Sequence, residues 1–234
     1  MSSKKLGSRK LLTIGGVLVA LVVLAVTVGP WAYGKFVVGE QPDELALPAA
    51  GASAAAEPDT TAATDALDGA WTVGGDSVAG YRVDEVLFGQ NVTVVGRTEK
   101  VEGEATVAGG TLDGVTMTVD MASVATDEAR RDAQYRDRIM DTATYPTATF
   151  TQTTPVDLPA TGGRFAVTVP GDLTVRGVTR AVEVELDVQA SGDALDVAGS
   201  IDVVFADFKI PEPGFSGISV DDHGTIEFLL RLAR

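Results

Sequence analysis

From Gly69 to the C-terminus, apolar and polar residues alternate with period two in several separate runs. Alternation of this kind predicts β-strands with one buried and one solvated face. Glycine-containing pairs such as Gly109-Gly110 and Asp113-Gly114 lie between the runs and are typical of tight turns. The predicted strands cover about residues 79–84, 101–107, 115–121, 148–154, 165–175, 182–188, 195–205 and 226–230.

One polar and one apolar face on each strand favours an all-β, antiparallel sheet with one side in water. Eight such strands can close into a barrel wide enough for side chains or one small ligand. A two-sheet sandwich produces the same pattern and stays open as the alternative. Small residues on the inward faces, at Ala79, Gly103, Ala105 and Gly199, leave volume unfilled and favour a cavity.

The alternation stops between Asp127 and Met140, where charged residues dominate. Thr126 can cap the N-terminus of a helix, and Asp127 and Glu128 are favoured in a first helical turn. Tyr145-Pro146 then ends the segment. The sequence therefore predicts one helical insert, which we expect to cover one mouth of the barrel.

The N-terminus has a different character. Leu11 to Val28 is apolar and uncharged, and Trp31 and Tyr33 follow it. A bilayer core needs about 20 such residues, and aromatic residues favour its interface, so we predict a transmembrane anchor over residues 11–33. Four basic residues within 1–10 predict a cytoplasmic tail. A cleaved signal peptide is the alternative, although its apolar core is usually only about 7–15 residues long.

Both interpretations place the rest of the chain outside the cytoplasm; the anchor makes the protein a single-pass protein of the cell membrane. Residues 39–68 carry seven acidic residues, no basic residue and few large apolar ones. Such a segment buries too little surface to fold. We therefore predict a disordered acidic linker over 39–68, followed by the barrel domain over 69–234.

Composition narrows the chemistry. The net charge of −15 disfavours nucleic-acid binding, because phosphates repel an acidic surface. Cysteine is absent, which excludes thiol catalysis and a zinc–cysteine site. The chain has one histidine, which disfavours a Ser-His-Asp triad. Asp221-Asp222-His223 and Asp84-Glu85 are adjacent residues, which point to opposite faces of a strand. We predict a turn for the first group, and neither a catalytic nor a metal site.

Three patches carry a family resemblance. Thr126, Arg131-Asp132, Arg136 and the run 145–150 (YPTATF) form a T…RD…R…YP…F pattern. Residues 171–180 (GDLTVRGVTR) read as a strand-turn-strand pattern, G-x-L-T-x-x-G-x-T-x. Residues 205–210 (FADFKI) pair with 226–228 (IEF). From about Gly69 to Arg234 the chain resembles the YceI-like domain family.

That resemblance implies a lipocalin-like antiparallel barrel, generally extracytoplasmic, that binds a long isoprenoid-type lipid in its interior. It implies a polyprenyl or quinone ligand, a role as carrier, buffer or sensor, and no other cofactor. Two residues depart from the pattern. Glu85 and Gln134 stand where many members have histidine, so any head-group or metal contact that depends on histidine is in doubt.

The large apolar side chains are candidates for the wall of a lipid tunnel, although most buried aromatic residues simply pack in a core. They are Tyr81, Phe88, Met117, Met140, Phe150, Phe165, Phe205, Phe208 and Phe228. Arg136 and Arg131 are candidates for binding a polar head group, because guanidinium geometry suits phosphate. The alternative for these arginines is a structural ion-pair network on the insert.

Other functions remain. A fully packed barrel could act as a protein–protein interaction module of the cell envelope, with no cavity and no bound lipid; the sequence names no protein partner. An enzyme is the weakest of the three hypotheses, because the threonines lack an activating base and no catalytic motif is present. The sequence favours a membrane-tethered lipid-binding domain that transforms nothing.

Overall fold

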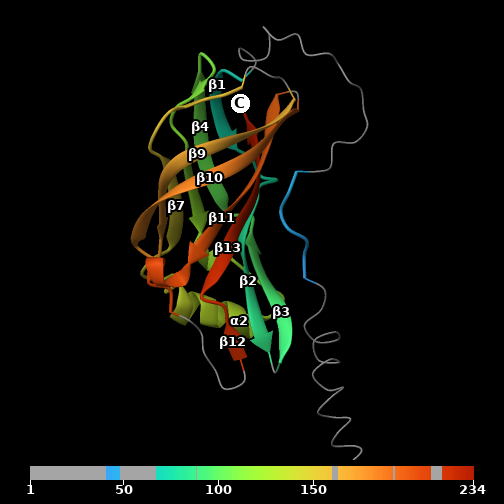
Figure 1. Ribbon diagram of the computed structural model, residues 1–234, viewed down its shortest axis with the longest axis vertical. Coiled ribbons are helices and arrows are strands. Elements are labelled where there is room, and N and C mark those ends of the chain that lie inside the picture. Colours follow the sequence, from blue (N-terminus) through green and yellow to red (C-terminus); the bar gives the residue numbers. More distant parts are fainter. Residues whose placement is uncertain (1–40, 48–66, 88, 160–162, 192, 212–217) are drawn as a thin grey trace, which may run out of the picture.

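The computed structural model describes residues 41–47, 67–87, 89–159, 163–191, 193–211 and 218–234 (Figure 1). Within these residues the chain is almost entirely β-structure, with one helical insert and two further short helical turns. The strands are β1 (Gly69–Val73), β2 (Val78–Leu87), β3 (Gln90–Thr98), β4 (Val101–Ala108), β5 (Thr111–Leu112), β6 (Thr116–Asp120), β7 (Thr147–Gln152), β8 (Val156–Asp157), β9 (Arg164–Val175), β10 (Val178–Ser191), β11 (Ala194–Val204), β12 (Ile218–Val220) and β13 (His223–Ala233).

Eight of these strands form a closed antiparallel ring. The hydrogen-bonded order runs β13-β11-β10-β9-β7-β6-β4-β1 and returns to β13. Closure depends on β1, which pairs with β13 at Thr72↔Ala233 and with β4 at Trp71↔Ala105. A two-sheet sandwich has no such continuous ring, so the barrel prediction is confirmed.

All eight strands expected from the alternation are present, but the ring uses β1 where the prediction had residues 79–84. The predicted strand is β2, which forms a hairpin with β3 next to the ring. In β3 the adjacent residues Val94 and Val95 are both buried, which breaks the period-two pattern by which a strand is recognised. β1, β5, β8 and β12 are short and give too few alternations to detect.

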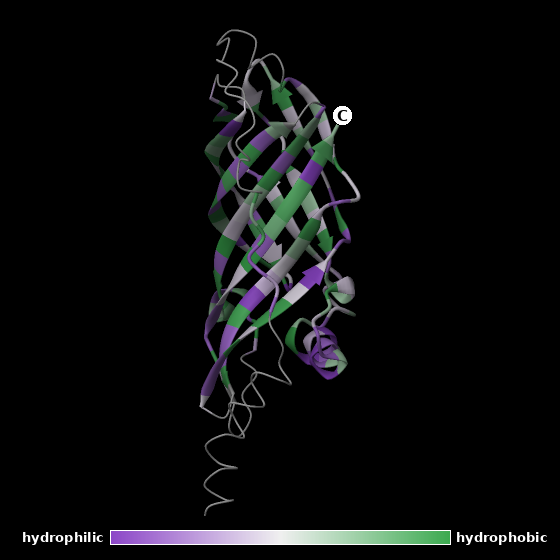
Figure 2. Ribbon diagram, turned by 90° about the vertical axis from the view of Figure 1, so that its right-hand side faces the viewer, coloured by the Kyte–Doolittle hydropathy of each residue, from purple (hydrophilic) through white to green (hydrophobic). Residues whose placement is uncertain are grey.

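The alternation observed in the sequence becomes the two faces of the wall (Figure 2). On β13, Ile226, Phe228 and Leu230 line the interior, whereas Arg231 is exposed to solvent. The interior holds two apolar clusters, one around Trp71 and one beside the insert. Each fully buried Val, Leu or Phe side chain contributes about 1.5–3 kcal/mol, and with no cysteine this packing replaces disulfides.

The insert begins after a short 3₁₀ turn, η1 (Met121–Ser123), and consists of α2 (Ala129–Gln134) and a π-helical turn, η2 (Tyr135–Ile139). The predicted N-cap at Thr126 is wrong. Glu128 caps α2, because its side chain accepts from the Arg130 amide at 3.1 Å. A third turn, η3 (Phe205–Phe208), ends β11 one residue before the predicted boundary.

Part of the predicted linker is folded. Residues 41–47 lie along the outside of the barrel (Figure 1, blue), and Leu47 and Leu67 are each only 5% exposed. These residues pack on the barrel because it supplies partners that the segment lacks by itself, and residues 48–66 of the predicted linker lie outside the described residues. No helix in the described part of the chain is long and apolar enough to cross a membrane. The predicted tail and anchor lie outside the described residues.

Candidate ligand-binding interior

Two apolar cavities lie inside the barrel. The Trp71-end cavity has a volume of about 160 Å³ and the insert-end cavity about 190 Å³. Ala79, Val119, Ala148 and Ile226 line both, so the cavities meet at one layer of the wall. An engineered apolar cavity of about 150 Å³ stays dry and binds benzene. Each half is therefore large enough for part of an apolar ligand, and together they suit an elongated one.

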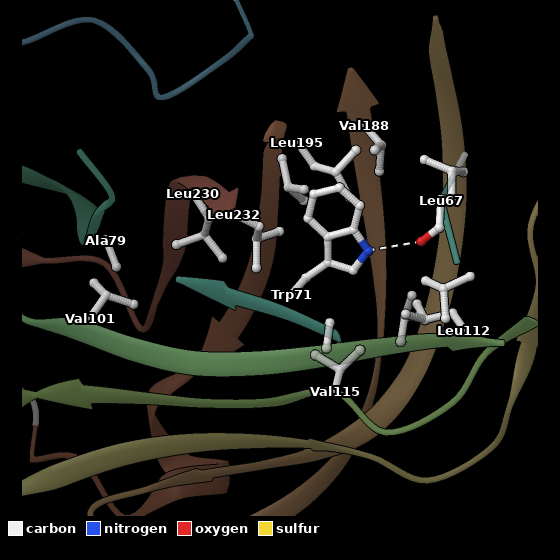
Figure 3. Close-up of a cluster of buried hydrophobic side chains, with 14 residues drawn as sticks. Leu67, Trp71, Ala79, Val101, Leu112, Val115, Val188, Leu195, Leu230 and Leu232 are labelled. Carbon is white, nitrogen blue, oxygen red and sulfur yellow. Dashed lines mark hydrogen bonds between the residues drawn. The ribbon is translucent and has the colours of Figure 1, made fainter. Parts of the chain in front are cut away.

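Trp71 lies at the centre of a cluster of buried apolar side chains at one end of the barrel (Figure 3). It is 1% exposed, and its indole N–H donates to the Leu67 carbonyl at 2.8 Å. The Arg234 guanidinium lies over the ring, 4.6 Å from its centroid. Leu112, Leu195 and Leu232 pack in the same cluster. This end is a packed apolar plug with its one polar atom satisfied.

The insert closes the opposite end. Tyr135, Ile139 and Met140 project from it and line the insert-end cavity. Tyr135 stacks on Tyr81 of β2, with ring centroids 5.4 Å apart and planes 9° from parallel. This stack connects the insert to the barrel wall. Such a contact is needed if the insert is to cover this mouth of the barrel.

Four large side chains lie against glycines on the neighbouring strand. A methyl group added at Gly96 would lie 2.4 Å from Cε1 of Tyr81, and one at Gly199 would lie 2.6 Å from Cζ of Phe228. Gly171 and Phe150 form the same arrangement at 2.3 Å from Cζ, and Gly103 lies against the sulfur of Met117 at 2.3 Å. The volume that was expected to stay unfilled at Gly103 and Gly199 is occupied by the side chains of Met117 and Phe228. The glycines therefore leave room for large side chains to lie against the wall.

The polar groups of the interior lie at the insert end. Glu85 lines the insert-end cavity and is half-buried. Burial raises the pKa of the Glu85 carboxyl, and the positive charge of Arg131 opposes that rise. Burial also raises the pKa of both Tyr81 and Tyr135, so their hydroxyls stay neutral donors at physiological pH. The Trp71-end cavity is lined by apolar side chains and Thr149.

The structure distributes the candidate wall residues over both cavities. Met117, Phe150, Phe165 and Phe228 line the Trp71-end cavity, whereas Tyr81, Met140 and Phe205 line the insert-end cavity. Phe208 is 4% exposed and packs in the cluster beside the insert, but it lines neither cavity. Phe88 lies outside the described residues. Ligand contact by these side chains remains a prediction.

The two candidate head-group residues lie on the insert, outside the lining of both cavities. Arg131 donates to Asp127 at 2.6 Å, and Asp132 accepts from the Thr126 amide and hydroxyl at 2.8 and 2.7 Å. These contacts favour the structural interpretation for Arg131. Arg136 is half-buried, and a head-group contact there stays a prediction.

The second of the three family patches, residues 171–180, also helps to hold the insert in place. Arg176 donates to the Ile139 carbonyl at 3.0 Å and to the Lys209 carbonyl at 2.6 Å. Its guanidinium lies 5.7 Å from the centroid of the Tyr145 ring, and that ring occupies the space beside Gly177. Residues of all three sequence patches therefore meet at the insert and hold it on the barrel.

The described residues hold no metal-binding cluster. No three His, Cys, Asp or Glu side chains there lie close enough to hold a metal ion. Asp222 and His223 pair at 2.9 Å at the exposed start of β13. This hydrogen bond lowers the pKa of Asp222 and raises that of His223. Asp222 forms a bend before the strand, consistent with the predicted turn.

Sequence reasoning missed three residues that shape the interior. Trp71 lies in a strand too short to recognise, although a tryptophan at the start of an apolar-patterned domain is a usable signal for a buried anchor. Tyr135 lies among the charges of the insert, where it is the one aromatic residue. The sequence showed Glu85 as a departure from the family pattern and as a poor acid–base partner of Asp84, and its position at the cavity needed the fold.

Comparison with known proteins agrees with this architecture. A polyisoprenoid-binding domain from Saccharophagus degradans, implicated in plant cell wall breakdown, is a similar solved structure; the TM-score is 0.57 at 22% identity, covering 70% of this chain and 97% of that one. BcnA from Burkholderia cenocepacia has a TM-score of 0.52 at 25% identity, covering 64% of this chain and 95% of BcnA.

Comparison with curated protein sequences finds no match. The profile of the YceI-like domain family matches residues 71–232, which span the ring from β1 to β13 together with the insert. The chain therefore belongs to the YceI-like domain family.

Proposed function

We propose that this domain binds a long-chain isoprenoid lipid, a polyprenyl lipid or a quinone, inside the barrel, and serves as a membrane-tethered, extracytoplasmic carrier, buffer or sensor. The observation that carries the proposal is the pair of apolar cavities that meet inside the closed barrel. The similar domain from Saccharophagus degradans is described as polyisoprenoid-binding. The predicted anchor over residues 11–33 would keep the domain at the membrane that holds such lipids.

The energetics favour a long apolar chain. Each CH₂ transferred from water contributes about 0.8 kcal/mol, so a chain of about 15 carbons gives roughly 12 kcal/mol. Association costs an estimated ~4–15 kcal/mol in lost freedom. A short terpene therefore binds weakly at best, and useful affinity requires a chain that extends through both cavities.

The ligand's orientation follows from where polarity lies. The apolar tail belongs at the Trp71 end, where the plug offers no free polar group. The head group belongs at the insert end, near Tyr81 and Glu85, with Arg136 as the candidate for a phosphate-bearing head. Binding without transformation is the expected activity.

Lipid mass spectrometry on residues 41–234, purified without detergent from a bacterial envelope, tests the proposal. We expect a stoichiometric isoprenoid or quinone. Phe150→Asp should abolish its retention, because a carboxylate in the wall cannot be solvated there. Thr151→Asp is the matched control, because Thr151 is exposed on the outer face one residue further along β7.

Native mass spectrometry with added farnesol and farnesyl phosphate then tests the head group. Arg136→Ala should weaken the phosphate-bearing probe and leave farnesol unchanged. A stable protein that carries no lipid and binds neither probe would replace the proposal with the packed interaction module. Unchanged lipid content in both Phe150→Asp and Arg136→Ala would overturn the assignment of residues.

A further inference from the structure

A carboxylate is buried on the outer face of the barrel, where a charge would normally be in water. Glu227 of β13 is 3% exposed, while its neighbours Ile226 and Phe228 line the interior. Arg97 contacts one carboxylate oxygen at 3.0 Å and Arg82 approaches the other at 3.5 Å. A buried ion pair requires its remaining hydrogen-bonding groups to be satisfied, so this cluster needs a cover.

The cover is the segment Gln41–Leu47, which we call the strap. The Leu45 amide donates to Glu227 Oε2 at 3.2 Å, and Arg82 donates to the Pro42 carbonyl at 2.9 Å. Arg97 donates to the Asp43 carbonyl. The contacts join the strap's backbone to three charged side chains from β2, β3 and β13, so this stretch of chain has a docking site on the wall.

The strap has a direction. Gln41 donates from its side-chain nitrogen to Asp127 at 3.2 Å, just before α2. The N-terminal end of the strap therefore lies at the insert end of the barrel, and the strap (blue in Figure 1) runs from there toward the end that carries β1. The chain passes the insert before it reaches the rest of the domain.

The short length of chain between the predicted anchor and the strap restrains the orientation of the barrel. A chain spans at most about 3.6 Å per residue, so residue 41 lies within roughly 30 Å of residue 33, where the predicted anchor ends. A chain free from residue 33 to residue 69 would reach roughly 130 Å by the same measure and restrain no orientation. With the strap docked, the insert end is the part of the barrel nearest the predicted anchor.

We propose that the strap orients the barrel with its insert end toward the bilayer surface, so that lipid passes directly between the membrane and the insert-end cavity. This inference rests on the proposed membrane tether and deepens the proposed lipid-binding function. The partner surface is the lipid bilayer itself.

Fluorescence energy transfer to the membrane tests it in the full chain. The chain has no cysteine, so single labels can be placed at Ala206→Cys in η3, beside the insert, and at Asp113→Cys, after β5 at the Trp71 end. Both positions are exposed. In phosphatidylcholine vesicles that contain a lipid-linked acceptor dye, we expect at least twofold higher transfer efficiency from position 206.

Changes in the strap alone separate orientation from folding. Leu45→Pro removes the backbone N–H that donates a hydrogen bond to Glu227. Leu47→Asp places a charge at a buried position of the strap. Neither substitution changes a residue of the barrel. Both should abolish the difference between the two labels. Glu44→Ala is the matched control, because Glu44 is exposed within the strap, and it should keep the difference.

The outcomes also distinguish this inference from the lipid-binding proposal. Equal transfer from both labels in the unmodified chain, or a difference that survives both strap substitutions, would overturn the strap's role even if lipid co-purifies. A strap-dependent difference in a protein that mass spectrometry finds free of lipid would support orientation and reject the lipid carrier.

Discussion

Adding one methyl group at Gly96 should move a tyrosine ring into the ligand cavity. The new Cβ would lie 2.4 Å from Cε1 and 2.8 Å from Cζ of Tyr81. No backbone atom is among its three nearest neighbours, and Gly96 does not have a positive φ. Gly96→Ala therefore perturbs one side chain of the insert-end cavity and leaves the strand geometry intact.

Two opposing effects set the size of the change. The alanine backbone loses less entropy on folding, which stabilises by about 0.4–1 kcal/mol. Overpacking costs typically ~1–3 kcal/mol, and here the ring must retreat by about 1 Å to reach ordinary contact distance while its stack on Tyr135 resists. Overpacking should win, with a net loss of roughly 0.5–2 kcal/mol and a Tm lower by about 1–8 °C.

Urea unfolding of residues 41–234 measures the stability, and native mass spectrometry with farnesol measures ligand retention. We expect Gly96→Ala to lower both, because Tyr81 would then occupy part of the 190 Å³ cavity. Gly75→Ala is the matched control, with nothing within 4 Å of its added methyl group. It should be neutral or slightly stabilising.

A Gly96→Ala variant that is as stable as Gly75→Ala and binds farnesol normally would refute the wall-glycine reasoning. It would mean that Tyr81 has an alternative position outside the lumen. Loss of stability without loss of binding would place the strain elsewhere and remove Tyr81 from the ligand site.

Three further predictions follow from single contacts. Trp71→Ala should cost about 3–5 kcal/mol in urea unfolding at unchanged m, as for other large buried aromatics, and a loss below 1 kcal/mol would contradict its role as a plug. Glu85 has a raised pKa in the fold, so the folded state binds its proton more tightly, and stability should fall as pH rises from about 4.5 through the raised value. Glu85→Gln should lack that part of the pH dependence; identical profiles for both proteins would exclude a buried carboxyl. Asp132→Ala removes the acceptor of two hydrogen bonds from Thr126 and should raise amide exchange across α2, whereas Asp132→Asn should raise it less.

Local periodicity predicted much of the fold because successive side chains of a strand point to opposite faces, so neighbouring residues show which face is buried. The eight runs, the insert and the three family patches all came from that level. The candidate wall residues came from residue type, because they are the large apolar side chains of the domain. Seven of those side chains line a cavity, but their part in binding a ligand is untested.

The features that shape the site arise between distant residues and leave no local signal. β1 closes the ring by pairing with both β13 and β4, and cross-strand register alone brings Tyr81 onto Gly96 and Phe228 onto Gly199. The strap is the clearest example of a contact between distant residues, because the Leu45 amide donates a hydrogen bond to Glu227, 182 positions away in the sequence. A stretch of seven residues with a proline and two acidic side chains buries little by itself and is predicted to be disordered, and only the barrel supplies the charges that hold it.

The sequence by itself determined the class of the domain, its strands and the apolar character of its interior, because each depends on residue type and short-range spacing. The tertiary structure decided whether that interior is open or packed, where its polar end lies and which way the chain leaves it. Those properties depend on which side chains meet across the barrel, and closure brings them together only when the register of every strand is set.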